Sequence, residues 1–266
     1  MRYRVLGPVQ IDTGTNVRSV SAPKMACILT TLLVRANRVV SRDALIGEMW
    51  GDDPPRRAVP SLHVHVSQLR KLLSTPGQAR NPLLTLASGY QMHIQPDELD
   101  VTVFQRLVRQ SRTHLEHGRL EESAAGYEEA LALWRGPVLG DVCRGPIVSG
   151  FMTWIEESRI ECLEGYVEVN LLLGRHRAMV SLLSSLVSEY PLHEAFYGQL
   201  MRALHASERR ADALNVYRRA SSVLDEELGL APSPTLRELQ SSLLGHDGRR
   251  HGGRRAPLGH PAGRIH

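Results

Sequence analysis

The spacing of apolar residues changes once along this chain, near residue 96, and this change limits the folds that the chain can adopt. Before it, stretches in which alternate residues are apolar, such as Tyr3 to Ile11, occur between stretches of helical spacing. From Asp100 to Leu244 only helical spacing is present, interrupted by Gly and Pro. We therefore expect a mixed fold, with an α+β domain over residues 1–96 and an all-α domain over residues 97–244.

The distribution of charge changes at the same point. Residues 1–96 contain 12 Lys and Arg against 5 Asp and Glu, whereas residues 97–244 contain 15 against 22. This contrast predicts that the basic segment binds a polyanion. The alternative is that these charges serve only solubility and are unevenly distributed along the chain. Residues 245–266 are rich in Gly, Arg and His without periodicity, which predicts a disordered basic tail.

The basic segment predicts strands, a helix, a short strand, two helices and a hairpin, in that order. The alternation from Tyr3 to Ile11 indicates a first strand, and "VRSVS" a returning one. Pro23 suits the start of the first helix, and Ser41 is a suitable N-cap for the second. In "LLTLASGYQMHI" two strands meet near Gly89, which would supply a positive φ. This order is that of a winged helix-turn-helix.

The third predicted helix, over residues 59–73, has an unusual polar side. At 100° intervals its apolar residues form one narrow stripe that would face the core: Val59, Leu62, Val66, Leu69 and Leu73. The opposite side and its shoulders carry a different set: Ser61, Val64, His65, Gln68, Arg70 and Lys71. No acidic residue occurs between Asp53 and Asp97, whereas a solvated helix face usually mixes acids with bases.

Each residue on this polar side suits the DNA major groove. Gln68 can hydrogen-bond to an adenine edge, and Val64 can contact a thymine methyl group. Arg70, Lys71 and His65 can reach phosphates. The alternative is a plain solvated basic face.

Lys24, Trp50 and the histidine pair of the third helix are further candidates for binding residues. Lys24 begins a helix and could hold a phosphate, although an ordinary exposed lysine is an equal alternative. Trp50 suits a core aromatic whose indole N–H could reach a phosphate. His63 and His65 cannot share a metal ion because they point about 200° apart on a helix, and we expect no metal site.

The acidic segment contains two helical stretches that can be overlaid with an offset of 34 residues. Met179, Leu183 and Leu186 then correspond to three residues of the later stretch: Ala213, Tyr217 and Ala220. A period of 34 residues is typical of tetratricopeptide repeats, which pair antiparallel helices. We expect a tetratricopeptide-like domain.

Enzyme signatures are absent from the sequence: GxxxxGK[ST], GxGxxG after a strand, GxSxG and HExxH do not occur. Asp141 is a carboxylate without an evident catalytic partner, so we expect a protein that is not an enzyme and needs no cofactor. The three cysteines, Cys27, Cys143 and Cys162, lie far apart, which argues against a disulfide framework or a zinc site. With neither a signal peptide nor a membrane span in the pattern, a cytoplasmic location is expected.

The chain also resembles a known family. "RANRVVSRDALIGEMWGDDPP", "LHVHVSQLRKLL" and "SGYQMHI" are similar to the OmpR-type winged helix of the SARP transcriptional activators. "PDELDVTVFQRLV", "ALALWRGPVLGDV" and "DALNVYRRASSVLDEELGLAPSPTLRELQ" are similar to the family's bacterial transcriptional activation domain. The resemblance implies activation of secondary-metabolite (antibiotic) gene clusters. It also implies two protomers on tandem direct repeats of promoter DNA, and contact with RNA polymerase, including its sigma factor.

The residues and the resemblance together give the candidate DNA-contacting positions: Lys24, Trp50, Arg57, Ser61, Val64, His65, Gln68, Arg70, Lys71, Ser88 and Tyr90. Some relatives carry arginine where this chain has Ser67 and Gln68, which favours adenine or shape readout over guanine readout here. Three other functions remain open at this point: a tetratricopeptide-like adaptor that binds protein, a catalytic protein that uses the acidic helical domain around Asp141, and a repressor, because a fold does not fix the sign of regulation.

Overall fold

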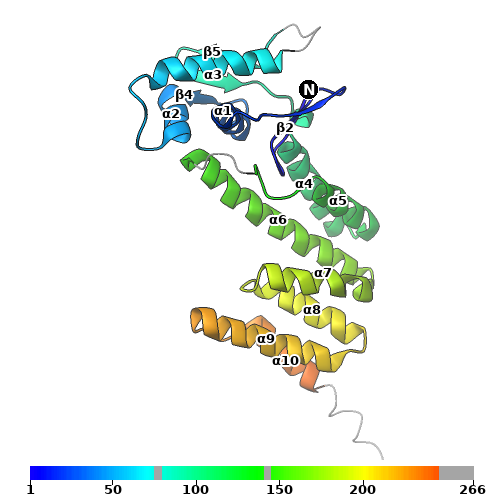
Figure 1. Cartoon of the computed structure of the whole chain (residues 1–266). Coiled ribbons are helices and arrows are strands. Elements are labelled where there is room, and N and C mark those ends of the chain that lie inside the picture. Colours follow the sequence, from blue (N-terminus) through cyan, green and yellow to red (C-terminus); the bar gives the residue numbers. More distant parts are fainter. Residues whose placement is uncertain (75–79, 141–144, 246–266) are drawn as a thin grey trace, which may run out of the picture. The chain divides into compact units, whose positions relative to one another are not determined.

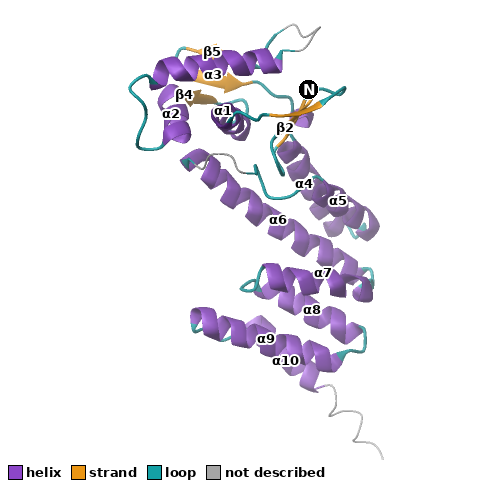
Figure 2. Ribbon diagram, in the orientation of Figure 1, coloured by secondary structure: helices purple, strands orange, loops and turns teal. Residues whose placement is uncertain are grey.

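The computed structural model describes residues 1–74, 80–140 and 145–245, and it divides into two compact units (Figure 1). The first unit runs from Met1 to Val169 and the second begins at Asn170. Strands lie only in the first unit, and from α4 onward the regular elements in the described residues are helices (Figure 2). The elements are β1 (Arg2–Arg4), β2 (Gln10–Asp12), β3 (Val17–Ser19), α1 (Pro23–Val34), β4 (Val39–Ser41), α2 (Arg42–Trp50), α3 (Ala58–Leu73), β5 (Leu83–Leu86), β6 (Gly89–Met92), the 3-10 helix η1 (Pro96–Glu98), α4 (Asp100–Glu116), α5 (Leu120–Ala132), α6 (Pro146–Leu172), α7 (His176–Glu189), α8 (Glu194–Ala206), α9 (Arg210–Leu228) and α10 (Pro234–Gly245).

The alternation at the start of the chain forms two strands, where the sequence indicated one. β1, β2 and β3 form an antiparallel sheet in which Tyr3 lies opposite Ile11. Gly7, between β1 and β2, has a φ of 136°, which an L side chain rarely adopts, and the chain reverses there. Tyr3 and Ile11 are each 1% exposed, so the apolar residues of the alternating stretch face the core.

Helices α1, α2 and α3 and the sheet β4-β6-β5 form the predicted winged helix-turn-helix. Pro23 occupies the first turn of α1, where its missing N–H removes no helical hydrogen bond. The Ser41 hydroxyl accepts a hydrogen bond from the Ala44 N–H at 3.1 Å and so caps α2, as expected.

Gly89 is required at the hairpin for a reason that differs from the expected one. The β5–β6 turn lies at Ala87 and Ser88, and Gly89 does not have a positive φ. A Cβ atom at Gly89 would lie 2.0 Å from the Val40 carbonyl oxygen on β4. Glycine is therefore needed because β4 and β6 approach closely there.

Hydrogen bonds to two carboxylates join the N-terminal part of the first unit to its helices α4 and α6. The Asp100 carboxylate, at the start of α4, accepts from the N–H groups of Val5 and Leu6 at 2.8–3.0 Å. The Glu48 carboxylate, on α2, accepts from the N–H of Ile147 at 2.6 Å, in the first turn of α6. Residue 96 marks a change of pattern in the sequence but lies inside this unit.

The second unit repeats a pair of helices. α7 begins at His176 and α9 at Arg210, which is the predicted offset of 34 residues. α8 packs against both α7 and α9. The aligned positions are buried in both helices except for Tyr217, which is half-buried: Met179, Leu183, Leu186, Ala213 and Ala220.

The cysteines require one correction. Cys27 is disulfide-bonded, although the wide spacing of the cysteines argued against disulfides. Cys162 is a free, buried thiol, and burial raises its pKa to about 12. Asp141, Cys143 and the tail after Gly245 lie outside the described residues. Within the residues that the structure does describe, none of the helices combines the length and apolar character needed to span a membrane.

Candidate nucleic-acid interface

Helix α3 presents a continuous ridge to solvent, formed by Ser61, Val64, Gln68 and Lys71, which we call the α3 ridge. Val64 is 55% exposed, Gln68 and Lys71 are exposed, and Ser61 is half-buried. Exposing an apolar side chain such as that of Val64 to water is unfavourable, and a partner that covers it would recover this free energy. The side chains on the opposite face are buried: Leu62, Val66, Leu69 and Leu73.

Val59 departs from the predicted apolar stripe, since it is 42% exposed. It lies in the first turn of α3, which begins at Ala58 after the loop that contains Pro54 and Pro55. Pro60 also belongs to this first turn, where its missing N–H removes no helical hydrogen bond.

Arg70 joins α3 to the wing. Its Nε donates to the Leu83 carbonyl at 3.1 Å, and its Nη2 donates to the Thr85 hydroxyl on β5. The Arg70 carbonyl in turn accepts from Asn81 Nδ2 at 2.9 Å. Two of the five guanidinium N–H donors are thus engaged on β5, so Arg70 positions the wing, and a phosphate contact through its other donors stays a proposal.

The two wing candidates differ in accessibility. Ser88 is exposed at the hairpin turn, where a DNA backbone could reach it. Tyr90 is only 3% exposed, because it lies with Met92 on the face of β6 that is buried, whereas Gln91 between them is only half-buried. Tyr90 is therefore a core residue of the wing and is removed from the proposed contacts.

Lys24 and Trp50 lie together at the end of α2. The Lys24 ammonium donates to the Met49 carbonyl and lies 5.1 Å from the centroid of the Trp50 ring. It thus occupies the negative end of the α2 dipole, with a cation–π contact beside it. The anchoring phosphate proposed for the start of α1 would compete with these contacts.

Other candidates border the α3 ridge. Arg57 is exposed immediately before α3, and His65 is half-buried, with an Nδ1 atom that has no partner among the described residues. His63 and Ser67 are exposed on α3 but were not proposed as contacts. The available signal was that His63 and Ser67 are four residues apart, and so share a helix face, next to Val64 and Gln68 in the sequence. The described residues contain no cluster of three His, Cys, Asp or Glu side chains that could hold a metal ion.

With this geometry established, known proteins can be compared. Residues 20–92 match the family model described as transcriptional regulatory protein, C terminal. Residues 99–244 match the model described as bacterial transcriptional activator domain. The chain is 35% identical over 254 residues to regulatory protein DnrI of Streptomyces peucetius, covering 93% of each chain. The chain belongs to the SARP family of transcriptional regulators.

Other SARP-type relatives differ in length. Regulatory protein AfsR of Streptomyces griseus is 34% identical over 247 residues, but the chain covers only 25% of it. A solved structure of EmbR from Mycobacterium tuberculosis, in complex with a low-affinity phosphopeptide, superposes with a TM-score of 0.87 at 34% identity. The match covers 91% of this SARP chain and 64% of EmbR.

Membership fixes the general function of this SARP protein. It is a DNA-binding transcriptional regulator, with an OmpR-type winged helix followed by an all-helical activator domain. The family consists of transcription factors and not of enzymes, which excludes catalysis by Asp141 as the protein's function. Because residues 20–92 belong to a family of DNA-binding regulators, a winged helix that acts as a protein-binding adaptor is not needed to explain the fold.

Proposed function

We propose that this SARP protein activates the genes of a secondary-metabolite (antibiotic) cluster by binding promoter DNA and recruiting RNA polymerase. Two protomers bind tandem direct repeats upstream of the promoter, and each inserts α3 into the major groove. The helical segment then contacts polymerase, including its sigma factor. This role would place the protein in the cytoplasm, on the nucleoid.

The α3 ridge is the observation that supports this proposal. It combines an amide that can pair with an adenine edge, a branched apolar side chain and an ammonium group, all facing outward. The sequence holds no acid from Pro54 to Pro96, so the ridge and the wing lack the negative charge that phosphates would repel.

The proposed base contacts are Val64 and Gln68, because both side chains lie at the centre of the exposed face. Lys71, Arg57, His65 and Ser88 are proposed to contact phosphates. Ser61, the member of the ridge nearest the start of α3, would contact either a base or the DNA backbone. Lys24 and Trp50 support the end of α2. They would contact the DNA backbone only through the ammonium N–H groups and ring atoms that are not already engaged there.

The test is a footprint of the full-length protein on the promoters that flank its own gene. We expect two adjacent protected segments of related sequence in the same orientation, with centres about 10 bp or a multiple of this apart. The observed affinity should fall steeply as salt rises, because phosphate contacts release counterions. A single protected site, or inverted half-sites, would contradict the direct-repeat arrangement.

Transcription with purified RNA polymerase on the same promoters separates an activator from a repressor. Added protein should increase transcript yield if polymerase is recruited. A decrease would make the protein a repressor while leaving its DNA-binding function intact.

A further inference from the structure

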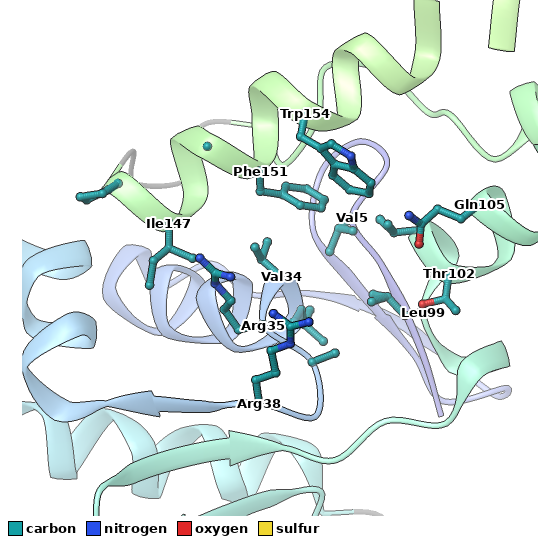
Figure 3. Close-up of a pocket in the computed structure, with 15 residues that line it drawn as sticks. Val5, Val34, Arg35, Arg38, Leu99, Thr102, Gln105, Ile147, Phe151 and Trp154 are labelled. Atoms are coloured by element: carbon teal, nitrogen blue, oxygen red, sulfur yellow. The ribbon is translucent and has the colours of Figure 1, made fainter. Parts of the chain in front are cut away.

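A cavity of about 530 Å³ lies within the first unit, between the end of α1 and the helices α4 and α6 (Figure 3). Its walls come from four parts of the unit: Val5 beside β1, Val34 at the end of α1, Leu99 and Thr102 at the start of α4, and Ile147 in the first turn of α6. A volume of this size falls within the range of small-molecule sites, roughly 300–1,000 Å³.

Two arginines supply the charge of this cavity. Arg35 follows α1 directly and Arg38 precedes β4, and both extend toward α6 (Figure 3). The residues that line the cavity include no Asp or Glu. Neither guanidinium has a hydrogen bond or ion pair with another residue in the described part of the chain. The cavity therefore has an excess of positive charge.

An aromatic pair forms the opposite wall. Phe151 and Trp154 lie on consecutive turns of α6, with ring centroids 5.6 Å apart and planes tilted by 49°. Trp154 is 42% exposed, although large aromatic side chains usually bury most of their surface. The open ring faces offer a surface for a planar apolar group.

The turn that carries both arginines is held in place by Asn37. Its backbone has a φ of 61°, a region that asparagine tolerates better than most residues. Its side chain donates to the Ile94 carbonyl at 2.8 Å and accepts from the Ile94 N–H at 3.0 Å. The two charges are thus attached to a turn that is fixed before any ligand arrives, which lowers the entropy lost on binding.

We propose that this cavity binds a small organic acid with a planar aromatic body. The ring system packs against Phe151 and Trp154, and the anionic group lies between Arg35 and Arg38. Arginine suits this role because its planar donors match a carboxylate or a similar anion. This site is separate from the α3 ridge and shares no residue with it.

Two fluorescent probes test the proposal on the full-length protein. 8-Anilinonaphthalene-1-sulfonate carries an aromatic body and a sulfonate, and N-phenyl-1-naphthylamine has the same rings without the sulfonate. The unaltered protein should bind the anionic probe at least roughly tenfold more tightly than the neutral one, as charged hydrogen bonds imply. Equal affinities for the two probes would overturn the proposal.

Substitutions locate the binding. In the double variant Arg35→Gln, Arg38→Gln the preference for the anionic probe should fall to about twofold or less, while the affinity for the neutral probe stays unchanged. Trp154→Ala should weaken both probes. The matched control is Arg237→Gln, which removes an exposed arginine of α10 in the second unit and should preserve the preference.

The opposite results would refute the assignment. These are a double variant that keeps its preference, a Trp154→Ala protein that binds both probes as before, and a control that loses the preference as the double variant does. If circular dichroism showed that the double variant does not fold, the preference of the unaltered protein and the Trp154→Ala result would still decide the question.

Discussion

The Glu48 carboxylate on α2 accepts a hydrogen bond from the N–H of Ile147, 99 residues later in the chain, at 2.6 Å. Its second oxygen lies 3.3 Å from the N–H nitrogen of Val148. Glu48 is 4% exposed, so a helix of the DNA-binding module caps the N-terminus of α6 from within the protein interior. Gly145 makes room for this cap, since a Cβ atom there would lie 2.5 Å from the Glu48 Cδ.

The first prediction concerns this cap. Glu48→Gln places an amide group where two backbone N–H groups need acceptors, and it removes the charge that favours the helix terminus. We expect a loss of about 1–3 kcal/mol in the free energy of unfolding, measured by urea titration. Glu128→Gln, on the exposed side of α5, is the control and should change stability little. Equal stabilities of the two variants would show that the cap contributes nothing.

The second prediction concerns the wing. Gly89→Ala brings a methyl group against the β4 backbone, and backbone cannot move aside as a flexible side chain can. We expect a destabilisation of roughly 1–3 kcal/mol or more, together with weaker DNA binding. Gly47→Ala on α2 meets nothing within 4 Å and should instead stabilise by roughly 0.5–1 kcal/mol. Thermal melting of both variants checks the difference in sign.

The third prediction separates base contacts from phosphate contacts on the α3 ridge. Gln68→Ala should cost about 1–3 kcal/mol on the preferred site and relax base preference at about one position. Lys71→Ala should weaken binding to preferred and random duplexes nearly equally, and should reduce the salt slope by about 1. Binding isotherms at several salt concentrations provide the measurement. Identical behaviour of the two variants on both duplexes would disprove the roles assigned to them.

The fourth prediction concerns Arg70. Arg70→Met keeps an apolar stem but removes the donors to Leu83 and Thr85, so the wing should lose its attachment to α3. Amide hydrogen exchange should accelerate across β5 and remain unchanged in α9. Affinity for DNA should fall by a similar factor on all sequences, because the change displaces the wing without altering a base contact. A loss confined to the preferred site would instead assign base reading to Arg70.

The sequence allowed accurate prediction wherever periodicity and local chemistry determine the structure. The bounds of α1 and α2 follow from Pro23, Ser41 and the spacing of buried residues. The predicted apolar stripe of α3 is correct from Leu62 to Leu73, because the helical repeat determines the face on which each residue within a helix lies. The outward direction of Val64 followed from the same geometry.

Long-range partners could not be predicted. Glu48 is a single acid in a short helix, and nothing in its neighbours indicates a backbone partner 99 residues away. The position of Arg70 on α3 suggested a phosphate contact, but it did not indicate that two of its donors bind Leu83 and Thr85 on β5. Tyr90 was misplaced because the sequence did not show which face of β6 packs against the core.

The paired anchors of Asp100 and Glu48 limit how nature or an engineer can recombine this protein. A hybrid joined at residue 96 would leave the amides of Val5 and Leu6 without their carboxylate and a buried Glu48 without a helix to cap, unless the incoming half supplied both. A junction placed within α6 would carry both anchors across intact. A chimaera that changes DNA specificity should therefore exchange the whole segment from the N-terminus to about α6, and not the winged helix alone.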